Sequence, residues 1–172
     1  LPEERRSQGI LPDMSVKENI SINTLDTVSS WCGISKRKEI TKAEEIIKAY
    51  NVKTSDLNKE IKFLSGGNQQ KVIIGRSTCT EPKILIFDEP TKGIDIGAKT
   101  EVYRLMKELA EKGIAIILIS SEMDEIKKCA NRIICMYHGE VTGECTYGSE
   151  KEEILKAILG IKTSDEEGQT DE

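Results

Sequence analysis

The chain has 172 residues, of which 32% are charged and 37% are hydrophobic, values typical of one globular domain or slightly more. Its longest apolar run, Ile114 to Ile119, is far shorter than the ~20 residues that cross a bilayer, so no membrane span is predicted. The net charge is −5, but residues 163–172 hold five acids and no base, so the remainder carries 25 bases and 25 acids. Without a basic excess, we expect no nucleic-acid partner.

The cysteines and the single histidine argue against a zinc site or a disulfide framework. Five cysteines are present, none in a C-x-x-C pair and none at zinc-type spacing from His138. Reduced thiols that serve as small buried groups fit best and indicate a cytoplasmic protein. The chain opens at Leu1-Pro2 without Met and without a signal-peptide stretch, so we expect part of a longer protein.

The first part of the chain is predicted to be helical. Ser15-Val16-Lys17-Glu18 has the form of a capping box, and a helix should run from it to about residue 25. Residues 26–37 contain several serines and a glycine and are predicted to be a loop. A second helix is expected over 38–50, where apolar residues share one face, and a short helix or turn is expected within the polar stretch 51–62.

Helices and strands should alternate after residue 65. A serine and two glycines precede a helix that ends before Pro82, and residues 83–87 have the composition of a buried parallel strand. A helix over 98–112, a strand over 115–120 and a helix over 122–129 follow. This order predicts a parallel sheet with crossover helices, whose ligands bind beyond the carboxyl ends of the strands.

The end of the chain is predicted to hold a hairpin and a helix. Strands over 133–137 and 140–145 flank His138-Gly139, a pair suited to a two-residue turn, which favours a structural role for His138. An amphipathic helix should cover 150–159. The acidic stretch 163–172 is expected to be disordered.

Two features carry candidate chemistry. Asp88 and Glu89 directly follow the strand at 83–87, and carboxylates at the end of a buried strand need a cation, which a magnesium nucleotide supplies. The helix that begins at Ser65-Gly66-Gly67 offers unpaired N–H groups and a positive dipole end, which suit a phosphate. Each feature alone would fit an ordinary strand end or helix cap.

In combination, the motifs point to a family. They are Leu64-Ser65-Gly66-Gly67-Asn68-Gln69-Gln70-Lys71, then Ile84-Leu85-Ile86-Phe87-Asp88-Glu89-Pro90-Thr91, then Gly93-Ile94-Asp95. This series resembles the ATP-binding subunit of ABC transporters. Asn68 and residues 92–99 and 119–123 are similar to the second, C-terminal cassette of the simple-sugar importers of the ribose, xylose and galactose type, as are residues 2–6 and 14–20. The resemblance covers roughly residues 1–147 and implies an α/β fold: a partial P-loop NTPase sheet with a helical subdomain.

The resemblance implies nucleotide binding by the signature motif. In this family the motif contacts the γ-phosphate of an ATP that the opposite cassette holds. The matching residues here are Ser65, Gly66, Gly67, Asn68 (where glutamine is usual) and Gln69.

It also implies roles for five other residues. Asp88 is the Walker B acid toward Mg²⁺, and Glu89 is the general base or water-orienting residue. Asp95 lies in the D-loop at the partner cassette. Glu3 stands where many members have the Q-loop glutamine, and Ser121 stands in place of the switch histidine, whose charge a serine cannot carry.

The implied division has three parts: the Q-loop region and helical subdomain (1–64), the signature, Walker B, D-loop and switch part (65–147), and a C-terminal helix with the acidic tail (148–172). The implied function is the later part of a nucleotide-binding domain that couples hydrolysis of Mg²⁺-bound ATP to monosaccharide uptake. Expected partners are a second ATPase cassette, membrane permease subunits and, indirectly, a sugar-binding protein, at the cytoplasmic side of the membrane.

The chain contains no G-x-x-x-x-G-K-[ST] loop. Since the amides and lysine of that loop hold the β- and γ-phosphates, we do not expect this chain to bind or hydrolyse ATP by itself. Two alternatives stay open: a non-catalytic docking or dimerisation module, and a soluble ABC ATPase of translation or DNA repair.

Overall fold

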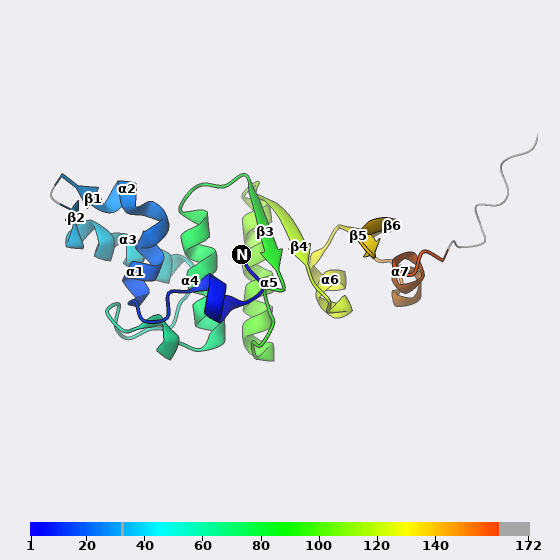
Figure 1. Cartoon of the computed structure of the whole chain (residues 1–172), viewed down its shortest axis with the longest axis horizontal. Helices are drawn as coiled ribbons and strands as arrows, with labels where there is room; N and C mark the ends of the chain where they lie inside the picture. Colours follow the sequence, from blue (N-terminus) through cyan, green and yellow to red (C-terminus); the bar gives the residue numbers. More distant parts are fainter. Residues whose placement is uncertain (32, 162–172) are drawn as a thin grey trace, which may run out of the picture. The chain divides into compact units, whose positions relative to one another are not determined.

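The computed structural model describes residues 1–31 and 33–161, so the predicted acidic tail at 163–172 lies outside the described residues (Figure 1). The chain forms two compact units, Leu1–Ser120 and Ser121–Glu172. In the described ranges, no helix combines the length and the apolar character that a bilayer crossing requires.

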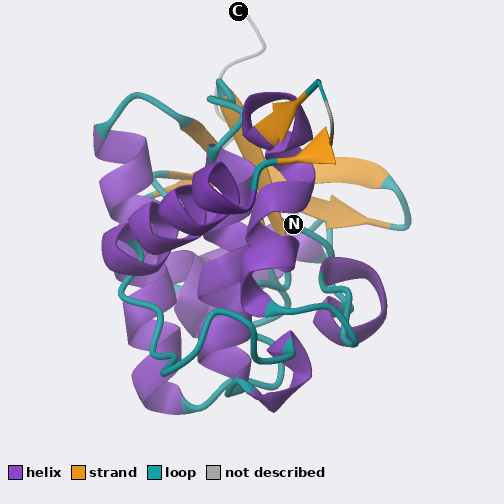
Figure 2. Ribbon diagram, turned by 90° about the vertical axis from the view of Figure 1, so that its left-hand side faces the viewer, coloured by secondary structure: helices purple, strands orange, loops and turns teal. Residues whose placement is uncertain are grey.

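Helices dominate the start of the first unit, which Figure 2 shows from the side of α1 and α3. A π-helical turn (Arg5–Gly9) precedes α1 (Val16–Ser21), which runs through a 3₁₀ turn (Ile22–Thr24) into α2 (Leu25–Val28). The predicted capping box is confirmed: the Ser15 hydroxyl accepts from Glu18 N, and Ser15 N donates to the Glu18 carboxylate at 2.7 Å. The polar stretch ends in a 3₁₀ turn, Ile61–Phe63.

The loop predicted over residues 26–37 is wrong in part. Strands β1 (Ser29–Ser30) and β2 (Gly33–Ile34) pair in antiparallel fashion, and α3 (Lys36–Ala49) starts two residues earlier than expected. Gly33 has a φ of +118°, a conformation that few other residues adopt. Two of the serines that suggest a loop, Ser29 and Ser30, therefore belong to a short hairpin.

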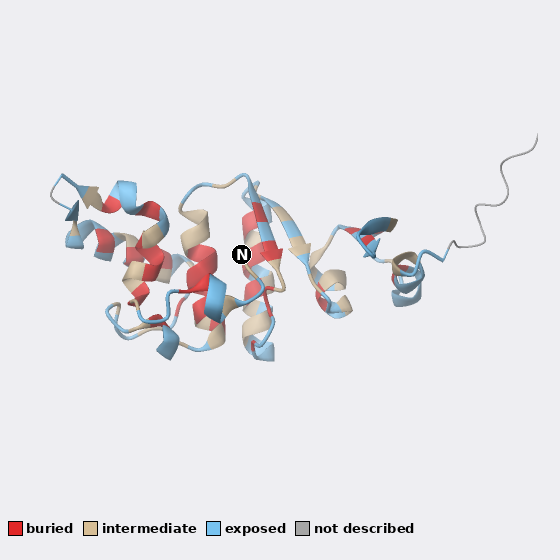
Figure 3. Ribbon diagram, viewed as in Figure 1, coloured by how far each residue is buried: buried red, intermediate tan, exposed pale blue. Residues whose placement is uncertain are grey.

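One apolar core joins α1, α3 and α4 (Gly66–Thr78). Figure 3 shows their buried residues in red, where the three helices meet. The core includes Ile20 of α1, Ile46 of α3 and Val72 and Ile73 of α4. Burial of one such side chain contributes about 1.5–3 kcal/mol. Because α4 begins with the signature residues, this core fixes the motif against the preceding helices.

The boundaries of the compact units differ from those of the three parts that the motifs predict. Residues 1–64 share a core with α4, and the two compact units divide between Ser120 and Ser121. The three-part division by motifs stays a prediction.

A parallel strand pair completes the first unit. β3 (Ile84–Asp88) and β4 (Ala115–Ile119) are parallel, and α5 (Ile96–Glu111) connects them, as predicted. The first residue of the chain extends the pair, since Asp88 N donates to Leu1 O at 3.1 Å. The prediction that the strand is buried throughout is wrong: Phe87 is fully buried, whereas Ile86 is 49% exposed, because the unit covers one face of the pair.

The second unit contains a hairpin and two helices. α6 (Met123–Cys129) precedes the antiparallel pair β5 (Arg132–Tyr137) and β6 (Glu140–Thr146), and α7 (Lys151–Ile158) follows. The strand at the predicted positions 133–137 thus pairs with β6. His138 and Gly139 have φ values of 49° and 86°, which confirms a turn with two left-handed residues.

The buried thiols of this unit behave as small apolar groups, as predicted. Cys135 and Cys145 lie in its core with Ile133 and Ile154. Burial raises the pKa of the Cys135 thiol to about 11, so the thiol stays protonated and unreactive at neutral pH.

An ion pair between Lys71 and Glu101 connects α4 to α5. Lys71 is only 3% exposed, and its Nζ also donates to Asn51 O at 3.0 Å. The hydrogen bond from Lys71 lowers the pKa of Glu101.

Replacing Glu101 with Gln should change how stability depends on pH. Since the pKa of Glu101 in the folded chain lies below its ordinary 4.5, the ionised pair stabilises the fold above that pH, and this contribution is lost as the pH falls through the lowered value. Denaturant titrations between about pH 6 and pH 3 should show a larger loss of unfolding free energy in the wild type than in Glu101→Gln. Glu111→Gln, at an exposed position of α5, should behave like the wild type; equal losses in all three proteins would refute the assignment.

Candidate functional site

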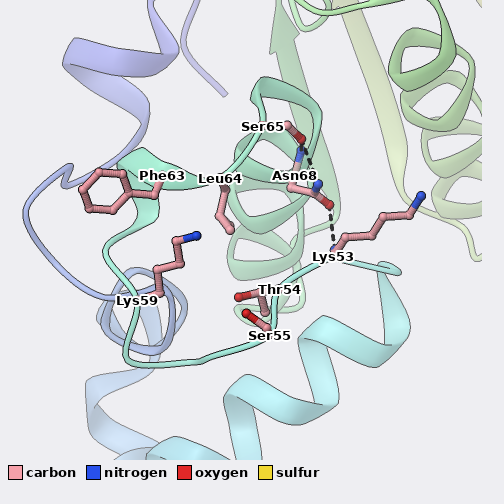
Figure 4. A pocket seen from close by; sticks show the side chains of 8 residues that line it. All are labelled: Lys53, Thr54, Ser55, Lys59, Phe63, Leu64, Ser65 and Asn68. Carbon is pink, nitrogen blue, oxygen red and sulfur yellow. Dashed lines mark hydrogen bonds between the residues drawn. The ribbon is translucent and has the colours of Figure 1, made fainter.

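The signature residues form the first turn of α4 (Figure 4). Ser65 is the N-cap, and its hydroxyl accepts from Asn68 N at 3.4 Å and from Asn68 Nδ2 at 2.8 Å. The N–H groups of a first turn have no acceptor within the helix, and they lie at the positive end of its dipole. This turn can therefore bind an anion such as a phosphate.

Asn68 connects the signature turn to the loop that follows α3. Its Oδ1 accepts from Lys53 N at 2.7 Å, while its Nδ2 donates to Ser65 (Figure 4). Both ends of the amide thus have partners within the chain, and Asn68 orients the Ser65 hydroxyl.

Gln69 is almost completely buried, with 4% of its surface exposed. Its Nε2 donates to Ile61 O at 3.2 Å and to Leu64 O at 3.1 Å, and its Oε1 accepts from Arg5 Nε at 3.1 Å. In this arrangement Gln69 holds the loop before α4 in place, and its amide does not face solvent.

Gly67 allows α4 and α5 to approach each other closely. A Cβ at Gly67 would lie 2.5 Å from Ala98 Cβ and 3.8 Å from Ile94 Cγ2. Ala98 lies in the first turn of α5, where Asp95 is the N-cap and its Oδ1 accepts from Ala98 N at 3.0 Å. The first turns of α4 and α5 therefore lie side by side, and they bring the signature turn next to Asp95.

The predicted catalytic acids lie at the carboxyl end of β3. Asp88 is the last residue of the strand and is half-buried. Glu89 has a φ of +44°, a left-handed conformation that is uncommon outside glycine, and its N–H donates to Ile119 O of β4 at 2.9 Å. Such strained backbone clusters at functional sites.

The position of Asp88 is compatible with a magnesium site that water and a nucleotide would complete. In the described residues, no group of three or more His, Cys, Asp or Glu gathers to hold a metal. Mg²⁺ in phosphate-binding sites is held by one or two carboxylates together with water and phosphate oxygens. Asp88 could supply a carboxylate of such a set, and Glu89 lies next to it in the chain.

The segment at residues 3–9 contacts the residues around both motifs. The Glu3 carboxylate forms an exposed ion pair with Lys92 Nζ at 2.5 Å. Arg5 donates to Gln69 of α4 and to Lys92 O at 3.4 Å, so it connects the signature turn to the loop before Asp95. Sequence reasoning missed Arg5, although it lies two residues from the candidate Q-loop position.

Ser121 is exposed and is the first residue of the second unit. Its role as the switch residue stays a prediction.

A cleft of about 440 Å³ opens beside the signature turn (Figure 4). Phe63 on its wall is 61% exposed, with Lys59 Nζ 5.9 Å from the ring centroid. Ammonium groups, hydroxyls and an exposed ring together suit an anion that carries a flat ring. The lining residues are Lys53, Thr54, Ser55, Lys59, Phe63, Leu64, Ser65 and Asn68. Of these residues, the sequence predicted only Ser65 and Asn68 as binding residues, because the composition of a polar stretch does not reveal how that stretch folds.

Comparison with known families agrees with this geometry. The family model described as ABC transporter matches residues 3–92, which include the signature turn and both acids. The chain belongs to the ABC transporter family. Asp95 and Ser121 lie beyond the matched range.

Among curated proteins, the chain is similar to ribose import ATP-binding proteins. It is 44% identical over 163 residues to the protein RbsA of Caldanaerobacter subterraneus, covering 93% of this chain and 33% of that protein. RbsA of Shouchella clausii is 45% identical over 141 residues, which cover 82% of this chain and 28% of that protein. The chain thus spans about a third of the length of these relatives.

Solved structures confirm the predicted fold. The ATP-binding cassette MJ0796, a dimer in a post-hydrolysis state bound to ADP and Pi, has a TM-score of 0.68 at 24% identity and covers 83% of this chain and 62% of its own. The ADP conformation of the cassette MJ1267 has a TM-score of 0.64 at 24% identity, with 87% and 60% covered. The chain has the α/β fold of ABC ATPase cassettes.

Gly67→Ala should destabilise the chain, because the added methyl would force α4 away from α5. Overpacking of this kind costs about 1–3 kcal/mol. Gly97→Ala is the control, since its Cβ would meet only Asp95 Oδ1, at 3.4 Å. Denaturant unfolding should show a loss for Gly67→Ala alone, and equal behaviour of the two variants would contradict the packing argument.

Arg5→Ala should lower stability by about 1–3 kcal/mol, because it leaves the buried Oε1 of Gln69 without its donor. Arg6→Ala removes the same charge from an exposed side chain and should have little effect. Urea unfolding measures both losses. The rate of backbone amide hydrogen exchange at residues 61–69 should rise only in Arg5→Ala. An unchanged rate there would show that Arg5 does not hold this segment in place.

Proposed function

We propose that this chain forms the signature side of an ATP site, and that a second cassette supplies the side that holds the phosphates. The observation that supports this most strongly is the first turn of α4 opening onto a cleft with two lysines and an exposed ring. The Ser65 hydroxyl and the amides of the turn would bind the γ-phosphate. Lys59 and Phe63 would contact the rest of the nucleotide.

Asn68 would act on this site through Ser65, and Gln69 would act on it through the loop before α4. Since both side-chain amides are bonded within the chain, Asn68 would fix the direction of the Ser65 hydroxyl, and Gln69 would fix the position of the turn and its N–H groups. Preorganised donors stabilise a phosphate without the cost of reorganisation. Gly66 would let phosphate oxygens approach the backbone, and Gly67 would keep the start of α5 close to the turn.

The acids would serve a nucleotide that the complete protein holds at the end of β3. Asp88 would bind Mg²⁺, which neutralises charge on the β- and γ-phosphates when bound. Glu89 would accept a proton from the attacking water or orient it. Asp95 would contact the partner cassette, Glu3 would occupy the Q-loop position, and Ser121 would stand at the switch position with weaker effect than a histidine.

For the complete protein, we infer an ATP-driven importer of a monosaccharide. The support is the similarity to proteins named for ribose import, of which this chain matches about a third. The chain would be the later part of the second cassette. Its helices α1 to α3 would dock on permease subunits at the cytoplasmic face, and a sugar-binding protein would deliver the substrate.

The alternatives have weaker support. An ABC ATPase of translation or DNA repair would need a surface for nucleic acid, and outside the tail the bases and acids are equal in number, 25 each. A docking or dimerisation module would associate with a cassette whether or not ATP is present.

Nucleotide titration tests the proposal. A fluorescent ATP analogue with Mg²⁺ is titrated into the chain alone, into an intact cassette that carries a phosphate-binding lysine loop, and into their mixture. We expect no binding to the chain alone and tighter binding in the mixture than in the cassette alone. Reversing one cleft charge, Lys59→Glu, should reduce that gain, while Lys83→Glu, at an exposed position before β3, should not.

Two results would contradict the proposal. Tight binding by the chain alone would mean that the signature side needs no partner. Association with the cassette that adds nothing to nucleotide affinity would favour the docking module.

A further inference from the structure

The hairpin of β1 and β2 exposes an aromatic residue to solvent. Trp31 follows β1 directly and is 99% exposed, and Ile34 of β2 is 52% exposed. Figure 3 shows this end of the first unit largely in the colour of exposed residues. Two-residue hairpin turns favour Gly, Asn and Asp, so turn geometry gives no reason for a tryptophan here.

Three exposed bases lie beside the hairpin. Lys36, Arg37 and Lys38 form the first turn of α3, and Lys38 Nζ donates to Ser29 O of β1 at 3.4 Å, which brings the turn next to the hairpin. Bases at a helix N-terminus are unfavourable, because they face the positive end of the dipole. Helix stability therefore does not explain their position.

The acids near these bases do not balance most of their positive charge. Glu39 is buried, forms an ion pair with Lys17 at 3.4 Å and accepts from the Ser21 hydroxyl at 3.0 Å. Residues 22–38 contain three bases and one acid, Asp26, so the local net charge is +2. The region thus combines an indole with unbalanced positive charge.

We propose that Trp31, Ile34, Lys36, Arg37 and Lys38, here called the hairpin surface, bind an anionic lipid bilayer. Tryptophan favours the headgroup level of a membrane, where its ring is partly apolar and its N–H finds an acceptor. Lysine and arginine next to an anionic leaflet gain attraction from lipid phosphates. The bases thus match the charge of the leaflet, and the indole and Ile34 match its interfacial layer.

Contact of this kind is shallow and reversible. One ring and one aliphatic side chain bury little area, so the hairpin surface orients the chain at a membrane and does not anchor it. It does not depend on the nucleotide site, since none of its five residues lines the cleft.

The fluorescence of Trp31 tests the proposal directly, because it is the only tryptophan in the chain. The 172-residue chain is mixed with vesicles of equimolar phosphatidylglycerol and phosphatidylcholine, or of phosphatidylcholine alone. We expect a blue shift of the emission with the anionic vesicles, quenching by lipids brominated near the headgroup, and a weaker response at high salt.

Charge variants separate this surface from general attraction. Lys36→Gln/Arg37→Gln should weaken vesicle binding about thirtyfold, from two lost lipid-facing charges. Lys107→Gln/Lys112→Gln makes the same change of net charge at exposed positions elsewhere and should bind as the wild type does. Thermal unfolding of each variant shows whether it is folded.

Four outcomes would overturn the proposal. One is that the emission of Trp31 does not change with anionic vesicles. Another is that the emission shifts equally with neutral vesicles. A third is that the two double variants lose vesicle affinity to the same extent. A shift that requires added permease in the vesicles would likewise assign the hairpin surface to a protein partner and reject the lipid.

Discussion

The buried amide of Gln69 is the contact on which the arrangement of the signature turn depends. It bonds to carbonyl groups of the loop before α4 and to Arg5, which lies 64 positions earlier in the chain. Leaving such an amide unpaired inside the protein is costly, so these segments keep one relative position. Since α4 continues into the core with α1 and α3, the cleft beside the turn has a fixed wall.

The close contact of two helix starts adds a second constraint. Gly67 lets the first turn of α4 lie against that of α5, where Asp95 caps the helix. Two positive dipole ends side by side favour negative charge nearby. The acids at the end of β3 carry negative charge and favour a cation instead. The backbone of Glu89 is strained, and the hydrogen bond from its N–H to β4 stabilises this conformation. Under the proposed function, the turn of α4 would therefore receive an anion and the end of β3 would receive a metal.

Short sequence patterns predicted the helices and strands well, whereas contacts between residues far apart in the sequence were not predicted. The Ser15–Glu18 box, the helix start at Ser65 and the two-residue turn at His138 each rest on a few neighbouring residues. The β1–β2 hairpin was missed because its serines also suit a loop. The bracing by Gln69 and Arg5 and the shape of the cleft depend on chain segments that only folding brings together.

Labelling with an ATP analogue that carries a photoreactive group on its γ-phosphate tests the central claim most directly. The claim is that the first turn of α4 receives a phosphate held by another cassette. When the chain is mixed with a cassette that has a phosphate-binding lysine loop, the label should appear on residues 63–68 of this chain, and it should be absent without that cassette. Labelling elsewhere on this chain, or equal labelling in both cases, would contradict the claim.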